Sequence, residues 1–161
     1  MDQVEITFLL NGVTQRRMVQ PNRVLIDLLR GEFGLLGTKL GCDQAVCGAC
    51  TVLADGDPVA ACATFAFEID GREVRTIEGL SEDKLHPVQQ AFVDNAAFQC
   101  GYCTPGMILL AAALLDREPD PDEATIRNWL SANICRCTGY KMIVEAVQQA
   151  AAAGRGRGRA K

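Results

Sequence analysis

The chain has 161 residues, of which 48% are hydrophobic and 22% charged, and its formal net charge is −4. This globular composition leaves room for one ordinary domain or two small ones and excludes a chain that is disordered throughout. The longest apolar run, at 106–115, is too short for a membrane span. The acidic, strand-like start MDQVEITFLL lacks the features of an export signal, so we expect a cytoplasmic protein.

The charge is unevenly distributed along the chain. Residues 1–150 hold 12 basic and 20 acidic side chains, whereas the Gly-Arg tail at 154–161 is basic and contains no acid. An acidic body is unfavourable for nucleic acid as the principal partner. We therefore expect no nucleic-acid partner and a disordered tail.

The first half of the chain has the patterns of a small sheet with one helix. Apolar alternation and turn signals such as Asn11-Gly12 predict strands. The expected strands are 4–10, 13–19, 51–54, 59–63 and 73–77, with Asp-Gly turns at 55–56 and 70–71. A helix is expected from about residue 24 to Gly31 or Gly34. This order, with a cysteine-rich loop after the helix, is that of a β-grasp ferredoxin.

From about residue 79 the hydrophobic period becomes helical. The expected helices are 87–97, 104–116, 122–134 and 139–153. The second is apolar nearly all round, which predicts the buried centre of a four-helix arrangement. We therefore expect an α+β chain with a ferredoxin-like domain at 1–78, a helical domain at 79–153 and the tail at 154–161. His86, just before Pro87, is expected only to help begin a helix.

The first four cysteines follow the spacing C-x4-C-x2-C-x11-C and are Cys42, Cys47, Cys50 and Cys62. A C-x4-C-x2-C run followed by a distant fourth cysteine is the plant-type 2Fe–2S pattern. The small residues of GCDQAVCGACTV allow the backbone to come close to a cluster, and backbone N–H groups of such a loop favour its negative charge.

The other four follow C-x2-C-x31-C-x1-C, in QCGYCTPG and NICRCTGY, and are Cys100, Cys103, Cys135 and Cys137. Each pair precedes an expected helix start, where free N–H groups favour an anionic cluster. Two cysteine pairs also suit zinc, although a zinc site normally has about 15–20 residues between its pairs. A 4Fe–4S site would need a C-x2-C-x2-C run, which this sequence does not contain.

Taken together, GCDQAVCGACTV with Cys62, and QCGYCTPG with NICRCTGY, resemble the small iron–sulfur subunit of the molybdenum hydroxylases. This superfamily includes xanthine dehydrogenase, aldehyde oxidase and carbon monoxide dehydrogenase. The resemblance covers residues 3 to about 150, and each of the eight cysteines falls where the family has one. It implies a ferredoxin-like domain followed by a four-helix 2Fe–2S domain.

The resemblance also implies a function. Electrons would leave a molybdopterin site, cross two 2Fe–2S clusters and reach FAD, with the Cys100–Cys137 cluster near molybdenum and the Cys42–Cys62 cluster towards the flavin. Gln99 and Cys137 would contact the pterin. The implied partners are an FAD-binding medium subunit and a large subunit with molybdopterin as cytosine dinucleotide, in a dimer of heterotrimers. No catalytic residues are expected on this chain.

Two other functions fit some of these observations. A free-standing two-cluster ferredoxin would shuttle electrons between enzymes, and a zinc-stabilised module would serve interactions. Trp129 is expected in the core or an interface, and Tyr102 and Tyr140 are expected to pack beside the cysteines. The substrate of a complex cannot be inferred from this chain.

Overall fold

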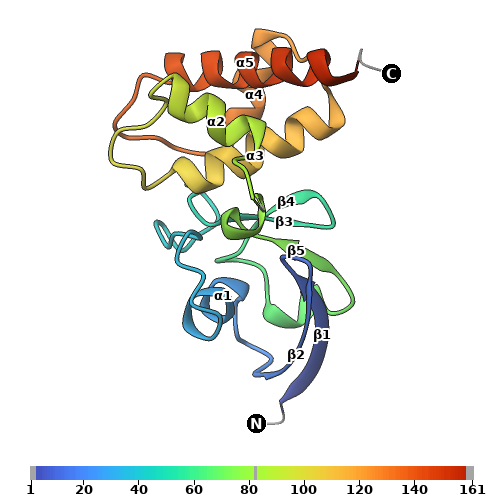
Figure 1. Cartoon of the computed structure of the whole chain (residues 1–161). Coiled ribbons are helices and arrows are strands. Elements are labelled where there is room, and N and C mark those ends of the chain that lie inside the picture. The colour runs from blue at the N-terminus through green and yellow to red at the C-terminus, as the bar shows by residue number, and fades with distance from the viewer. Residues whose placement is uncertain (1–2, 82, 159–161) are drawn as a thin grey trace.

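The structure, a computed structural model, describes residues 3–81 and 83–158, with side chains up to residue 154. It has two layers, a sheet domain with the N-terminus and a helical domain with the C-terminus (Figure 1). Their cores are separate: one gathers apolar side chains between Ile6 and Val74, the other between Val88 and Ala150. The expected α+β architecture is confirmed.

The sheet domain is a five-stranded mixed sheet with strand order β2-β1-β5-β3-β4. Its strands are β1 (Val4–Leu10), β2 (Val13–Val19), β3 (Thr51–Ala54), β4 (Asp57–Ala60) and β5 (Glu73–Arg75). The β1–β2 hairpin pairs Val4 with Val19 and turns at Asn11-Gly12, both of which have positive φ. Strands β1 and β5 are parallel, whereas the other three pairs are antiparallel. The β1–β2 hairpin therefore joins the antiparallel strands β5, β3 and β4 through one parallel pair at the centre of the sheet.

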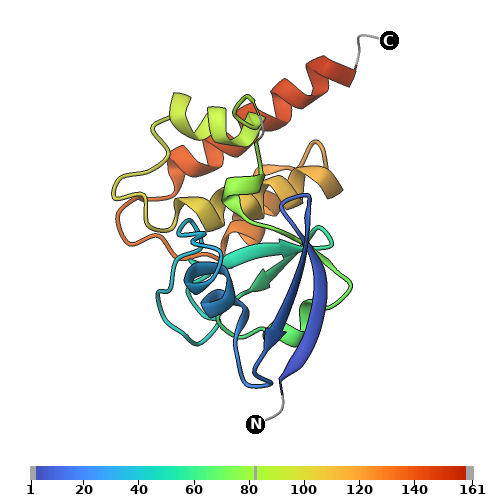
Figure 2. The same cartoon turned by 60° about the horizontal axis from the view of Figure 1, so that its bottom comes forward.

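Helix α1 (Leu25–Gly31) lies beside this sheet (Figure 2), and its buried leucines belong to the same core as the apolar side chains of the strands. Two short 3-10 helices that the sequence did not predict follow, η1 (Ala66–Ile69) and η2 (Ile77–Gly79). The strand expected at 59–63 lies earlier, at Asp57–Ala60, on the sheet edge. Proline has no backbone N–H to donate, and Pro58 is tolerated because an edge strand needs hydrogen bonds on one side only.

The helical domain contains α2 (Pro87–Asp94), α3 (Thr104–Arg117), α4 (Glu123–Leu130) and α5 (Lys141–Gly158). His86 caps α2, as expected: its Nδ1 accepts a hydrogen bond from the Val88 N–H. Helix α3 is buried along most of its length and contacts α2, α4 and the sheet strand β3. Leu53 of β3 packs against Leu109 and Ala113 of α3, and so joins the two domains.

Three helix ends differ from the sequence prediction. Helix α2 stops at Asp94 rather than at residue 97, because the chain turns at Ala96, which has left-handed backbone. Helix α4 stops at Leu130 rather than at residue 134, because the Ile134 N–H is used in a hydrogen bond to the sheet domain. Helix α5 continues to Gly158 and extends beyond its neighbours (Figure 2), whereas disorder was predicted from Gly154. The alanines at 150–153 are strong helix formers, and extending an existing helix is easy. Residues 159–161 lie outside the described part of the chain.

No helix among the described residues is both long enough and apolar enough to cross a membrane.

Candidate metal centres

The loop between α1 and β3 holds the first three cysteines and points backbone N–H groups at sulfur. Cys42 Sγ accepts hydrogen bonds from the N–H groups of Gln44, Val46 and Cys47 at 3.3–3.4 Å. The Ala45 N–H donates to Cys62 Sγ at 3.3 Å. Left-handed backbone at Asp43 and Ala45 turns these groups inward. The loop is therefore a cradle for negatively charged sulfur.

Two cysteines of this quartet, Cys50 at the end of the loop and the later Cys62, lie in the core of the sheet domain. Cys50 and Cys62 are 2% and 7% exposed, and their Sγ atoms are 3.4 Å apart. Burial raises the pKa of the Cys50 thiol to about 11, whereas the N–H groups of Cys47, Gln44 and Val46 lower the pKa of Cys42 to about 7. Cys42 thus favours the thiolate form, whereas Cys50 keeps its proton unless a metal displaces it.

The second quartet combines exposed and buried thiols. Cys100 and Cys137 are exposed. Cys103, directly before α3, and Cys135, in the loop between α4 and α5, are partly buried. Burial raises the pKa of Cys103 to about 12. Burial also acts to raise the pKa of Cys135, but hydrogen bonds from the Thr138 hydroxyl and N–H bring it below its ordinary value.

The two quartets open into one pocket. Its volume is about 300 Å³, and six of the eight cysteines line it: Cys42, Cys47, Cys100, Cys103, Cys135 and Cys137. Gly41 also lines it, and a Cβ there would lie 2.9 Å from Cys47 Sγ, so glycine lets that sulfur approach the backbone. The eight thiols, grouped in fours with N–H groups aimed at sulfur, fit two 2Fe–2S clusters.

Two hydrogen bonds tie the loops of the quartets together across this pocket. The Ile134 N–H donates to the Cys47 carbonyl at 2.8 Å, and Tyr102 Oη donates to the Leu40 carbonyl at 2.5 Å. Tyr102 lines the pocket beside the cysteines, as expected, and its 48% exposed side chain links the two domains at the surface. Gln99 is exposed next to Cys100.

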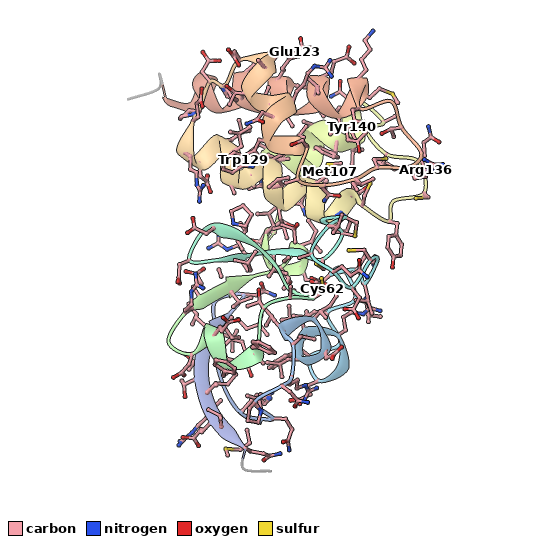
Figure 3. The ribbon with its side chains drawn as sticks, turned by 180° about the vertical axis from the view of Figure 1, so that it is seen from behind. Cys62, Met107, Glu123, Trp129, Arg136 and Tyr140 are labelled. Carbon is pink, nitrogen blue, oxygen red and sulfur yellow. The ribbon has the colours of Figure 1, made fainter. Side chains whose placement is uncertain are left out.

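Tyr140 does more than pack. Its Oη accepts a hydrogen bond from the Cys135 N–H at 2.6 Å and donates to the Asn133 carbonyl at 3.4 Å. Trp129 lies partly buried against the helical core, as expected, and its Nε1 donates to the Leu110 carbonyl at 2.7 Å. Figure 3 shows Tyr140 and Arg136 towards one end of the helical domain, and Trp129 towards the other.

Three residues at the sites were not singled out in the sequence: Thr138, Asn133 and Gly106. Both Asn133 and Thr138 lie within the motif NICRCTGY. A hydroxyl three residues after Cys135 can reach back to its sulfur, and an amide at the end of an apolar helix face is a signal for a buried hydrogen bond. Gly106, inside an apolar helix where alanine is the better helix former, signals a close contact.

Comparison with known proteins supports the two-domain view. Residues 8–77 match a family described as a 2Fe–2S iron-sulfur cluster binding domain, and residues 76–148 match a second [2Fe-2S] binding domain family. The nicotinate dehydrogenase small FeS subunit of Eubacterium barkeri is 48% identical over 151 residues, which is 93% of this chain and 96% of that protein.

Solved structures agree. Quinoline 2-oxidoreductase from Pseudomonas putida 86 superimposes with a TM-score of 0.91 at 41% identity, over 97% of this chain and 98% of that one. Aldehyde oxidoreductase from Desulfovibrio gigas gives 0.92 at 43% identity, over 96% of this chain but 17% of the larger protein. With two 2Fe–2S binding domains and relatives of this identity along almost its whole length, the chain belongs to the small iron–sulfur subunits of the molybdenum hydroxylase family.

Proposed function

We propose that this chain carries electrons from a molybdopterin site to FAD within a molybdenum hydroxylase complex. One 2Fe–2S cluster is held by Cys42, Cys47, Cys50 and Cys62, and the other by Cys100, Cys103, Cys135 and Cys137. Bound clusters of this type supply one-electron transfer. The observation that carries the proposal is that both quartets line the same pocket and that their loops share the Cys47–Ile134 hydrogen bond.

The residues around the sulfurs fit this task. The N–H groups of residues 44–47 and the Thr138 hydroxyl donate to cysteine sulfur, and such bonds stabilise the more negative, reduced form of a cluster. The backbone hydrogen bond between Cys47 and Ile134 offers an electron a bonded path between the loops.

The direction of the path follows the family resemblance. On that basis we assign the Cys100–Cys137 quartet to the molybdenum side, with Gln99 and Cys137 contacting the pterin. The exposure of Cys100 and Cys137 is compatible with this, because a partner can bring its cofactor close to this quartet, whereas Cys50 and Cys62 are buried in the other domain. The Cys42–Cys62 quartet faces the flavin side.

Exposed apolar side chains near the pocket favour a permanent subunit over a free shuttle. Val46, Tyr102 and Ile134 are 63%, 48% and 51% exposed, and each lines the pocket or adjoins a residue that does. An apolar surface of this kind is normally covered by another protein. The proposed partners are an FAD-binding subunit and a large subunit with molybdopterin cytosine dinucleotide, arranged as a dimer of heterotrimers. The cytoplasmic location remains a prediction from the sequence.

The test is EPR of the dithionite-reduced protein, with iron and acid-labile sulfide counted on the same sample. Two distinct rhombic signals and about four irons per chain are expected for two 2Fe–2S clusters. A single signal, or zinc in place of iron, would contradict the assignment of the second quartet. Size-exclusion of the protein from its own host tests the subunit role, since a stable species of 17.4 kDa would instead indicate a shuttle.

A further inference from the structure

The side chain of Asn133 occupies the junction between the two domains. It is 1% exposed, in the loop between α4 and Cys135, and its Nδ2 donates to the Gly48 carbonyl at 3.1 Å. Gly48 directly follows Cys47 in the cradle of the other quartet. The same carbonyl also accepts from the Thr51 hydroxyl at 2.7 Å, which fixes its direction. The amide therefore connects one candidate ligand loop to the other: Gly48 is one residue from Cys47, and Asn133 is two residues from Cys135.

The surrounding backbone is built to admit this amide. A Cβ on Gly106 of α3 would lie 2.6 Å from Asn133 Nδ2 and 2.6 Å from the Gly48 carbonyl oxygen. A Cβ on Gly48 would lie 2.3 Å from the Ala132 carbonyl oxygen. Real Cβ contacts are not this short, so both positions must lack a side chain for the loops to meet as they do.

The backbone of Asn133 is held from the other side. Its carbonyl accepts from Tyr140 Oη, which itself accepts from the Cys135 N–H. A chain of hydrogen bonds thus runs from Gly48 through Asn133 and Tyr140 to Cys135. Tyr140, labelled in Figure 3, lies in the helical domain above the sheet domain that contains Cys62.

Stability does not explain an asparagine at this position. Its Oδ1 is buried and has no hydrogen-bond partner within the described part of the chain. Burying an unpaired carbonyl is unfavourable, and an apolar side chain of the same shape would avoid that cost. What an apolar side chain cannot do is donate to the Gly48 carbonyl.

We propose that Asn133 is a positioning residue whose side-chain amide holds the two cluster-binding loops at a fixed separation, so that electrons cross between the clusters through the Cys47–Ile134 contact. This rests on the proposed function, because it requires a cluster in each quartet. Asn133 binds neither cluster; it acts through the Gly48 carbonyl on one loop and through its own backbone on the other.

The test compares Asn133→Leu with the unaltered protein, purified in full length with the subunits that accompany it. Leucine keeps the branched shape and removes both the donor and the unpaired oxygen. Three quantities are measured: the melting temperature, the iron content, and the magnetic splitting between the two reduced clusters in low-temperature EPR. The rate at which an electron injected by flash reduction redistributes between the two signals is followed by freeze-quenching.

With Asn133→Leu we expect an unchanged iron content, an equal or higher melting temperature, and redistribution slowed by roughly two- to tenfold with a weaker splitting, since one hydrogen bond closing the junction is lost. Asn133→Ala, which also opens a cavity, should slow the transfer at least as much. Asn95→Ala is the matched control, because it removes an amide that donates to the Ala91 carbonyl at 2.8 Å inside the helical domain. It should leave splitting and rate unaltered.

Two results would overturn the proposal. If both Asn133 variants keep the splitting and the rate of the unaltered protein, the amide does not set the separation, while the proposed function stands. If the unaltered protein itself shows only one cluster signal, the proposed function fails and the positioning role fails with it.

Discussion

The Cys47 carbonyl accepts a 2.8 Å hydrogen bond from the Ile134 N–H, which joins a loop before β3 to a loop after α4. Cys47 is a candidate ligand in one quartet, and Ile134 precedes Cys135, a candidate ligand in the other. This backbone contact therefore helps to set the separation between the quartets. Substitutions that displace this backbone should alter electron transfer even where every cysteine is retained.

Gly48→Ala tests that backbone contact. Gly48 has φ +71, and its added Cβ would meet the Ala132 carbonyl oxygen at 2.3 Å. We expect a loss of stability of about 2–5 kcal/mol, from left-handed strain and overpacking combined. Chemical denaturation of the reconstituted protein gives the value, and the splitting between the cluster signals reports the displacement.

The matched control is Gly71→Ala. Gly71 has nearly the same φ, +74, but among the described residues no atom lies within 4 Å of its added Cβ. It should show the left-handed strain only, about 1–2 kcal/mol. Equal losses for both variants would mean that the domains do not meet as closely as the structure has them.

Cys137→Ser should remove one cluster and spare the other. The candidate ligands fall in separate domains with separate cores, so loss of a thiolate from the helical domain leaves the ferredoxin-like site intact. Iron should fall from about four to about two per chain, with one EPR signal retained. Cys42→Ser should retain the opposite signal. Equal loss of both signals in either variant would contradict the assignment of the quartets.

Thr138→Val should lower the reduction potential of the helical-domain cluster. The Thr138 hydroxyl donates to Cys135 Sγ at 3.0 Å, and a donor to sulfur stabilises the reduced cluster. The expected shift is about 20–60 mV, part of the free energy of one hydrogen bond to a charged group. EPR-monitored redox titration measures it. Thr138→Ser keeps the hydroxyl and should keep the potential, as should the other cluster in both variants.

Gln99→Ala should slow turnover of the complex without loss of either cluster. Gln99 is exposed beside Cys100, so its side chain can contact a cofactor held by a partner subunit. Steady-state assay of the purified complex with its substrate measures turnover, and iron content confirms that the clusters remain. Gln90→Ala is the matched control, because the Gln90 side chain donates a hydrogen bond to Asp94 on the exposed surface of α2. Identical kinetics for the two variants would remove Gln99 from the pterin contact.

Local patterns in the sequence predict much of this fold. The β1–β2 hairpin follows from alternation around Asn11-Gly12, and the position of α3 at the centre of the helices follows from its apolar surface. The cysteine spacing also predicts two groups of four. The hairpin and the helix depend on residues that are neighbours in the chain, and the quartets are marked by short cysteine motifs.

Features that depend on distant residues were missed or misplaced. Helix α4 ends early because Ile134 bonds Cys47, which is outside any local window. The short helices η1 and η2 arise where the chain must turn back to β5 and leave the sheet. The role of Asn133 appears only once the domains are stacked, since its partner Gly48 lies on the opposite loop. Tyr140 bonds Cys135 and Asn133 within its own loop, across a turn with left-handed backbone at Tyr140 that the pattern of apolar residues does not predict.

The difference in burial between the two quartets imposes an order on maturation. Cys50 and Cys62 belong to the same core as Ile6 and Leu28, and once this core has closed, its packing keeps incoming iron away from their sulfurs. Cys100 and Cys137 remain open to solvent on the finished chain. Iron delivery to the ferredoxin-like site therefore has to coincide with folding, whereas the helical-domain site can be filled afterwards, up to the moment at which another subunit covers it.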